Sequence, residues 1–208
     1  MVRTRHPERR VLHGGRAAFC LAAALAAGCA GGSNGPGANG PRKNLTAADY
    51  YPLAQGWKWA YDLEKDGQKI LAVYAVLERS GDTAVVQAGE DRLSYAITPE
   101  GIAQKDGPTV GDYVIKNPVT VGTEWPVAGG TAKVVAVANE VTVGAGRFSN
   151  CVVVEVTRSD PVRVARTTFA PDVGPVALEF QVQDGNRFVT STRASLRSVT
   201  KPGEDLFH

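Results

Sequence analysis

The sequence predicts a mainly β protein, built as an antiparallel curved sheet, a sandwich or an open barrel of about 8–10 strands. Short segments in which large apolar residues alternate with polar ones indicate strands that bury one face. Clusters of Gly, Pro, Asn and Asp separate these segments, as expected for consecutive hairpins. Beyond the N-terminal region, no stretch as long as a typical helix shows helical periodicity. We expect a signal helix and a disordered tether to precede this β-rich domain.

Residues 1–28 follow the order of regions found in a secretory signal peptide. A basic segment is followed by an apolar stretch, Ala17–Ala27, and then by Gly28 and Cys29. The segment Leu25–Cys29, Leu-Ala-Ala-Gly-Cys, resembles the lipobox of bacterial lipoproteins, with Ala26 where leucine is commoner. The resemblance implies a thioether-linked diacylglyceryl group on Cys29 and cleavage between Gly28 and Cys29. It also implies acylation of the new amino group, for example with palmitate.

Two other interpretations of this segment are a membrane-spanning anchor and plain secretion after cleavage at another site. The apolar stretch has eleven residues, whereas a membrane span needs about 20. Cys20 is a poorer lipid acceptor, because the bulky Phe19 precedes it where glycine or alanine is required. Arg9-Arg10 resembles part of a twin-arginine signal, but the flanking residues favour the general secretion route. We therefore prefer the lipoprotein interpretation, in which several acyl chains would make the anchoring stable.

Residues 29–44 are expected to form a lipidated cysteine and a flexible linker, because glycine, asparagine, serine and proline dominate them. A linker of about fifteen residues has an r.m.s. reach of roughly 20 Å, which would hold a domain just clear of the lipid headgroups. The composition changes at Thr46–Asp49, where a short helical turn capped by Thr46 is expected. We expect the β-rich globular domain over residues 45–200 and a C-terminal tail over residues 201–208.

The first two strands form the clearest hairpin in the sequence. In Trp57–Glu64 every odd-numbered residue is large and apolar, and Asp66-Gly67 follows, the pair favoured in a two-residue type I′ turn. This turn predicts pairing of Leu63 with Ile70, Tyr61 with Ala72, Trp59 with Tyr74 and Trp57 with Val76. The shared face would be part of the core or would line an apolar-ligand site, and its four aromatic residues are Trp57, Trp59, Tyr61 and Tyr74.

Further strands are expected along the rest of the domain. They are Thr83–Gln87, Leu93–Thr98, Tyr113–Lys116, Thr131–Ala138, Asn150–Arg158, Val162–Phe169, Val176–Gln183 and Arg187–Val199. The last two are joined by Asp184-Gly185-Asn186, for which we predict a three-residue turn, because Asn186 tolerates a left-handed conformation. This turn would align Val182 with Phe188, Phe180 with Thr190 and Leu178 with Thr192.

Three patches extend over most of the domain. In one-letter code they are DYYPLxxGxxWxY at residues 49–61, VxAGxFxNCxxV at 143–154 and FAPDVGPV at 169–176. In this order they resemble a loosely defined set of exported bacterial lipoproteins of unknown function. The resemblance implies a β-rich domain carried on a lipobox cysteine, and it implies no catalytic residues. Each patch also has a purely structural interpretation, in which prolines and glycines form turns and the aromatic residues pack a core.

Charge and histidine content argue against several functional classes. Without residues 1–28 the chain keeps 18 basic and 20 acidic side chains, scattered along the sequence, so the basic footprint of a nucleic-acid-binding protein is missing. His6 and His13 lie in the signal, which leaves His208 at the C-terminal end. A Ser-His-Asp triad, a Cys-His pair or a histidine-ligated zinc site is therefore not expected.

The remaining reactive groups have ordinary structural interpretations. Cys151 lies in an apolar strand and is expected to be a core thiol and not a nucleophile. Acidic pairs such as Asp62/Glu64 and Glu90/Asp91 are expected to be solvated, and Gly144-Ala145-Gly146 lacks the third glycine and the helix of a nucleotide-binding loop. We expect no enzymatic activity, no metal and no cofactor.

Two functional hypotheses remain open. The first is a non-catalytic envelope protein in a structural or protein-interaction role, and the second is a carrier or sensor of an apolar ligand such as a lipid. Its partners would be the membrane, through the N-terminal lipid, and an envelope protein or lipid, but no nucleic acid. Cys29 is followed by Ala30 and Gly31 and not by the aspartate that retains some lipoproteins in the inner membrane. This favours the outer membrane, with the domain facing the periplasm.

Overall fold

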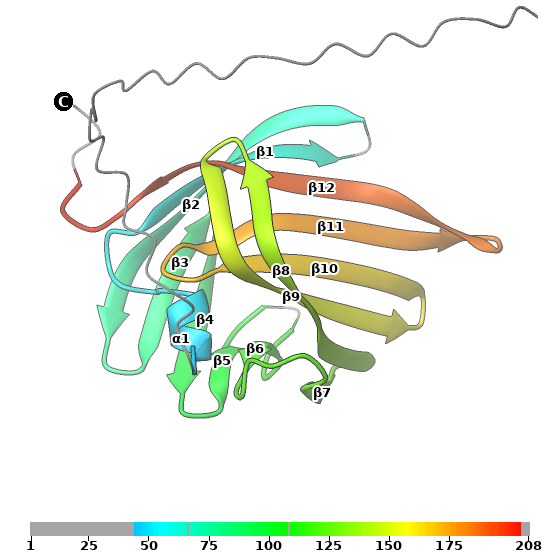
Figure 1. Cartoon of the computed structure of the whole chain (residues 1–208), viewed down its shortest axis with the longest axis horizontal. Helices are drawn as coiled ribbons and strands as arrows, with labels where there is room; N and C mark the ends of the chain where they lie inside the picture. The colour runs from blue at the N-terminus through cyan, green and yellow to red at the C-terminus, as the bar shows by residue number, and fades with distance from the viewer. Residues whose placement is uncertain (1–43, 66, 108, 205–208) are drawn as a thin grey trace, which may run out of the picture. The chain divides into compact units, whose positions relative to one another are not determined.

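The computed structural model describes residues 44–65, 67–107 and 109–204 (Figure 1). The signal segment, the Gly28–Cys29 cleavage site and nearly all of the linker lie outside the described residues. So do Asp66, which was expected in the first hairpin turn, and the last part of the C-terminal tail.

The described residues form a four-residue helix and one antiparallel sheet of twelve strands, which confirms the predicted fold class. The sheet is nearly closed and barrel-like, in the order β6-β5-β4-β3-β2-β1-β12-β11-β10-β9-β8-β7 (Figure 1). The elements are α1 Ala47–Tyr50, β1 Lys58–Lys65, β2 Gln68–Ser80, β3 Thr83–Ala88, β4 Asp91–Thr98, β5 Gly101–Gln104, β6 Tyr113–Lys116, β7 Glu124–Val127, β8 Gly130–Val143, β9 Gly146–Ser159, β10 Val162–Ala170, β11 Gly174–Asp184 and β12 Arg187–Thr200.

Two short strands, β5 and β7, were missed from the sequence and bring the count above the expected range. β5 begins at Gly101, whose φ of +145° suits only glycine, and a Cβ there would lie 2.3 Å from the carbonyl oxygen of Ile115. β7 contains Pro126, which is a strand breaker in most settings. β7 is an edge strand of the sheet, where the missing N–H of a proline does not interrupt a ladder.

The first hairpin has the predicted register. Leu63 pairs with Ile70, Tyr61 with Ala72 and Trp59 with Tyr74. Trp57 lies just before β1, and its carbonyl oxygen accepts a hydrogen bond of 2.8 Å from the N–H of Val76, whereas its own N–H donates to Ala54. The expected Trp57–Val76 pair is therefore only half formed.

The register predicted for the last hairpin is wrong. Asp184 pairs with Arg187, so the turn has two residues, Gly185 and Asn186, instead of three. Gly185 adopts the positive φ of +59°, as the first position of a type II′ turn requires. Val182 therefore faces Val189, and a bulge between Phe180 and Gln181 places Phe180 opposite Thr192 and Leu178 opposite Ala194.

Two cross-strand rows define the two faces of the sheet. On the inner face, an apolar row crosses seven neighbouring strands from β8 to β2; its members are Val134, Val154, Thr167, Leu178, Ala194, Leu63 and Ile70. The adjacent residues point to the outer face, because side chains alternate along a strand. They form a charge row of strictly alternating sign, extended to β7; its members are Glu124, Lys133, Glu155, Arg166, Glu179, Arg193, Glu64 and Lys69.

The two edge strands, β6 and β7, are joined by side chains. The indole N–H of Trp125 in β7 donates a hydrogen bond of 2.9 Å to the carbonyl oxygen of Tyr113 in β6. Next to it, the Asp112 carboxylate accepts from the N–H of Ala128 at 2.8 Å and pairs with Arg158 at 3.0 Å. Arg158 also donates to the carbonyl oxygen of Ala128. These contacts bring the sheet close to closure between β6 and β7, and we call this contact region the seam.

The expected helical turn is present as α1. The Asp49 carboxylate accepts hydrogen bonds of 2.7 Å from both the N–H and the hydroxyl group of Thr46, so the third helical residue caps the N–H of the N-cap residue, as in a capping box. The N–H of Ala47 donates to the side chain of Asn117 at 2.8 Å, and the N–H of Asp172 donates to the carbonyl oxygen of Asp49, also at 2.8 Å. These bonds fix the segment that places Tyr50 and Tyr51 in the core.

Candidate functional site

An aromatic cluster occupies the inner face of the sheet beside α1. The Tyr51 ring lies 5.9 Å from that of Trp59, 5.7 Å from that of Tyr95 and 6.1 Å from that of Phe169. Trp59 is 1% exposed, and its indole N–H donates a hydrogen bond of 2.6 Å to the carbonyl oxygen of Val173. Side chains from β1, β4, β10 and the segment after α1 therefore meet around Tyr51.

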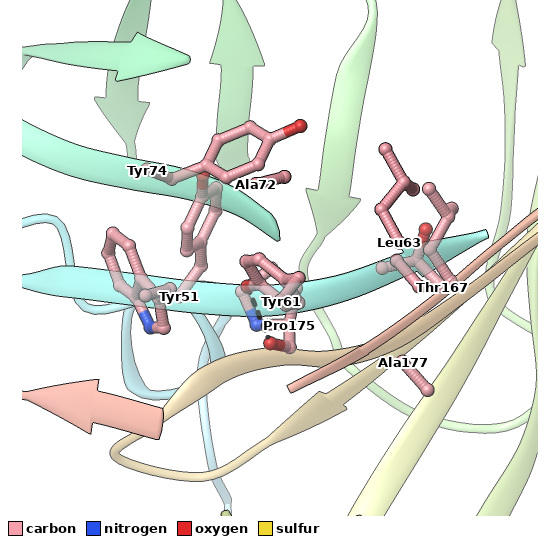
Figure 2. A pocket seen from close by; sticks show the side chains of 11 residues that line it. Tyr51, Tyr61, Leu63, Ala72, Tyr74, Thr167, Pro175 and Ala177 are labelled. Atoms are coloured by element: carbon pink, nitrogen blue, oxygen red, sulfur yellow. Dashed lines mark hydrogen bonds between the residues drawn. The ribbon is translucent and has the colours of Figure 1, made fainter. Parts of the chain in front are cut away.

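A cavity of about 180 Å³ lies beside this cluster, and we call it the aromatic cavity (Figure 2). Tyr61 and Tyr74 form one part of its wall in an edge-to-face pair, with ring centroids 5.5 Å apart and planes at 88°. Small residues keep the space open, because Ala72 and Ala194 occupy positions where longer side chains would fill it. The full lining comprises Tyr51, Trp59, Tyr61, Leu63, Ala72, Tyr74, Thr167, Pro175, Ala177, Leu178 and Ala194.

A second cavity of about 280 Å³ lies between the aromatic cavity and the seam. It shares Tyr51, Thr167 and Pro175 with the aromatic cavity, so the two are neighbours. At its seam end it is lined by Asp112 and Arg158, whose ion pair is mostly shielded from solvent, at 12% and 26% side-chain exposure. The inner face of the sheet therefore carries two neighbouring cavities, one aromatic and one with a polar end, both partly open to solvent.

The aromatic cavity contains no Asp, Glu, Lys, Arg or His side chain among the described residues. Its tyrosines stay protonated at neutral pH, because burial raises the pKa of Tyr51, Tyr61 and Tyr74 above the ordinary value of 10.0. The Tyr61 hydroxyl donates a hydrogen bond of 2.8 Å to the carbonyl oxygen of Pro175, and the Tyr51 hydroxyl bonds to that of Tyr95. The cavity is thus uncharged and lined by aromatic rings and short aliphatic groups.

Of the four aromatic residues singled out from the sequence, three line this cavity: Trp59, Tyr61 and Tyr74. Trp57 instead stacks on Trp59, with centroids 5.6 Å apart and planes at 16°, and the ammonium group of Lys201 lies 5.8 Å from its ring. Sequence reasoning missed the contributions of the other strands. Their positions follow from the pairing of β1 with β12, which joins segments that are far apart in the chain and brings the β10–β11 hairpin next to β12 and β1.

The candidate groups for chemistry lie elsewhere and have structural partners. Asp62 pairs with Arg197 at 3.3 Å on the outer face, and Glu64 belongs to the charge row. Cys151 is fully buried, and burial raises the pKa of its thiol to about 11, which disfavours the nucleophilic thiolate. Gly144 and Ala145 form the two-residue turn between β8 and β9, where the N–H of Ala145 donates to the carbonyl oxygen of Leu196.

Across residues 44–204, apart from positions 66 and 108, no cluster of His, Cys, Asp and Glu has the arrangement of a metal site. Within the same residues, no helix combines the length and the apolar character that crossing a membrane requires.

No protein-family model and no curated protein matches the chain. Two solved structures resemble it, each 13% identical in sequence and each matching 73% of this chain. One is a candidate exported protein with a YmcC-like fold from Bacteroides fragilis, with a TM-score of 0.48 over 99% of that chain. The other is a candidate lipoprotein from Parabacteroides distasonis, with a TM-score of 0.44 over 98% of that chain. At this identity and these TM-scores, the likeness assigns neither a family nor an activity to this chain.

Proposed function

We propose that the protein is a lipid-anchored component of the cell envelope whose β domain binds an apolar ligand inside its sheet and catalyses no reaction. Cys29 would carry the lipid and hold the domain at the outer membrane, facing the periplasm. The lipobox-like segment and the glycine-rich linker support the anchor. The aromatic cavity supports the ligand-binding role, because a core built only for stability fills its interior to the density of an organic crystal.

The aromatic cavity is the single observation that carries this proposal. Empty cavities of about 150 Å³ lined by apolar side chains stay dry and bind benzene-sized molecules. The aromatic cavity has a similar volume, about 180 Å³, but is partly open to solvent, and its lining consists of aromatic rings, aliphatic side chains and one threonine. Together with the neighbouring cavity of about 280 Å³, it gives room for an apolar group with a longer tail. A carrier or sensor of a lipid-like molecule needs such an interior.

Binding of a hydrocarbon probe tests this proposal. We expect the lipid-anchored protein in lipid nanodiscs to bind α-methylstyrene in equilibrium dialysis, with empty nanodiscs as the reference for partitioning. Ala194→Leu should abolish binding and leave the fold intact, because the added methyl groups fill the aromatic cavity from β12. Ala75→Leu is the matched control, since Ala75 lies next to Tyr74 on β2 but does not line the cavity.

Mass spectrometry of protein extracted from envelopes provides a second readout. A stoichiometric apolar molecule that is lost in Ala194→Leu would support the proposal. Absence of probe binding by the wild-type protein, or binding that Ala194→Leu does not change, would refute it.

The anchor is tested separately with radioactive palmitate. Wild-type protein should be labelled, and Cys29→Ala should not. Equal labelling of both would contradict the assignment of Cys29. Fractionation of inner and outer membranes then tests the location.

A protein-interaction role is the second candidate, and the edge of β2 favours it. β3 pairs only with Tyr74–Ser80 of β2, and the N–H of Gly89 after β3 donates to the carbonyl oxygen of Val73, so residues 68–72 have no neighbouring strand on that side among the described residues. Ile70 and Leu71 in this free edge are 50% and 56% exposed. Exposed edges of this kind accept an extended segment of a partner protein as an additional strand.

Pull-down from envelope extracts tests this second role. The N–H and C=O groups of Leu71 point away from β1, because hydrogen-bonded pairs alternate along an antiparallel ladder. Leu71→Lys should therefore reduce capture of a partner. Val121→Lys is the matched control, because Val121 is equally exposed, at 57%, and lies outside the sheet. Equal capture by both variants would exclude the edge as the binding surface.

A further inference from the structure

The aromatic cavity has a hydrogen-bond donor that the fold does not use. Four hydroxyl groups belong to its lining, those of Tyr51, Tyr61, Tyr74 and Thr167. Tyr61 donates to Pro175, and Tyr51 is bonded to Tyr95. The hydroxyl groups of Tyr74 and Thr167 make no hydrogen bond within the part of the chain that the structure describes, and neither is fully buried, so in the free protein they are solvated.

The ring of Tyr74 is held in a defined orientation. It packs edge-to-face against Tyr61, and the register of the first hairpin places Tyr74 opposite Trp59. Tyr61 is in turn fixed by its bond to Pro175. Figure 2 shows Tyr74 on the same wall as Ala72, with its hydroxyl group extending away from the ring of Tyr51. A donor fixed in this way costs little conformational entropy when it meets a ligand.

The lining also limits the charge of the ligand. A charged group transferred from water into an apolar site without a counter-ion carries a large desolvation cost. The aromatic cavity contains no ionised side chain, and the ion pair of Asp112 with Arg158 lies in the neighbouring cavity, where the two charges neutralise each other. A carboxylate or ammonium group would therefore find no compensating charge beside Tyr74.

We propose that the aromatic cavity selects an uncharged apolar ligand that carries a carbonyl oxygen, and that the Tyr74 hydroxyl donates a hydrogen bond to this oxygen. The assignment rests on the proposed ligand-binding function and adds the chemical class of the ligand. A cavity of about 180 Å³ fits a single ring or a comparable branched acyl group. Tyr74 is then a specificity-determining residue, and the rings of Trp59 and Tyr61 supply the apolar contacts.

Three probes of matched shape distinguish the effect of ligand charge on affinity from the effect of a hydrogen bond. Acetophenone has a carbonyl oxygen, α-methylstyrene replaces it with a methylene group, and benzoate is the charged analogue with the same number of non-hydrogen atoms. Their dissociation constants are measured by equilibrium dialysis with the lipid-anchored protein in nanodiscs of uncharged lipid, with empty nanodiscs subtracted. Tyr74→Phe removes only the donor. Tyr50→Phe is the control, because its hydroxyl donates to the carbonyl oxygen of Asn150 and does not line the cavity.

Loss of one neutral hydrogen bond should weaken acetophenone binding by Tyr74→Phe roughly three- to tenfold. Binding of α-methylstyrene should be unchanged in this variant, and Tyr50→Phe should bind all probes like the wild-type protein. Benzoate should bind at least about a hundredfold more weakly than acetophenone.

The possible failures are distinguishable. If neither uncharged probe binds the wild-type protein, the proposed ligand-binding function fails and this assignment fails with it. If both bind and Tyr74→Phe affects them equally, the cavity is used but the role of Tyr74 is wrong. The same conclusion follows if Thr167→Val, and not Tyr74→Phe, weakens acetophenone alone. Benzoate binding as tight as that of acetophenone would overturn the restriction to uncharged ligands.

Discussion

The alternating signs of the charge row on the outer face lead to a prediction that would not follow from an isolated ion pair. Glu179 in β11 lies between Arg166 and Arg193, its register neighbours in β10 and β12. Its carboxylate lies 3.5 Å from the guanidinium group of Arg193 and accepts hydrogen bonds from Thr190 at 2.8 Å and Gln181 at 2.9 Å. Glu179→Lys would place three cations side by side in the middle of the row.

The cost of this substitution follows from the number of neighbours. Each cross-strand charge pair contributes roughly 0.2–1 kcal/mol, and like charges directly opposite cost a similar amount. Glu179→Lys replaces the attraction to Arg193 by repulsion and places a second cation opposite Arg166, whose own ion pair is with Glu155 at 2.7 Å. We therefore expect a loss of about 1–2 kcal/mol in the free energy of unfolding. For a domain of this size, this corresponds to a fall in Tm of roughly 2–8 °C. Most of the effect should disappear in about 1 M salt, where the Debye length is about 3 Å.

A double substitution that exchanges the two charges of one pair distinguishes a coupled row from a set of independent ion pairs. Combining Glu179→Lys with Arg193→Glu restores one pair but leaves Lys at position 179 beside Arg166 and Glu at position 193 beside Glu64. We therefore expect little recovery in urea unfolding curves.

The control is the exposed pair of Asp62 and Arg197, which lies outside the row at 3.3 Å. Asp62→Lys with Arg197→Glu should recover the stability that either single change removes. Full recovery by the exchange within the row would refute the coupling.

Three further predictions follow from individual side chains. Trp59→Phe should lower the free energy of unfolding by about 2–4 kcal/mol, measured in urea, because it leaves the Val173 carbonyl oxygen without its donor and opens a void. Trp57→Phe should cost less, because the Trp57 indole makes no hydrogen bond within the described residues. Hydrogen bonds from Thr190 and Gln181, and then the charge of Arg193, lower the pKa of Glu179 from 4.5, so its stabilisation is full above about pH 4.5 and is lost as the pH falls through the lower folded pKa. Unfolding at pH 6 and pH 3 should show a smaller acid-induced loss in Glu179→Gln than in the wild-type protein, and equal losses would contradict this. Cys151, with a thiol pKa of about 11, should react with iodoacetamide at pH 8 only after unfolding; rapid labelling of the folded protein would show that the thiol is accessible.

The sequence predicts the first hairpin well because three local signals agree. Apolar residues alternate along Trp57–Glu64, a favoured turn pair follows, and a slip by one residue would turn the aromatic face outward. Local signals fail in the last hairpin, where Gly185 allows a two-residue turn and the extra residue of a bulge, Ser191, lies in β12 opposite the Phe180–Gln181 step. Both turn lengths suit the same local sequence, so the turn residues alone do not choose between them.

The aromatic cavity could be predicted only in part. The sequence predicts one shared face for Trp59, Tyr61 and Tyr74, which line the cavity. It does not show whether this face packs in the core or lines a site for an apolar ligand. The difference depends on Ala72 and Ala194, which come together only through the pairing of β2, β1 and β12. An alanine in a strand gives no signal of its own, since it fits a close-packed core as well as the wall of a cavity.

The two rows together explain how a sheet keeps a hollow interior. Along the apolar row, Val134 and Val154 are completely buried, whereas Ile70 at the other end is 50% exposed, so packing holds the β8–β9 side more firmly than the β1–β2 side. The charge row crosses both sides and contributes to the sheet from its outer face, without filling the interior. A loss of stability and a loss of binding should therefore be separable by substitution. A substitution in the charge row such as Glu179→Lys should lower Tm and leave probe affinity unchanged, whereas Ala194→Leu should abolish binding and raise stability by roughly 0.5–2 kcal/mol. A loss of affinity in Glu179→Lys, at a temperature where the protein is fully folded, would show that the outer charges also shape the cavity.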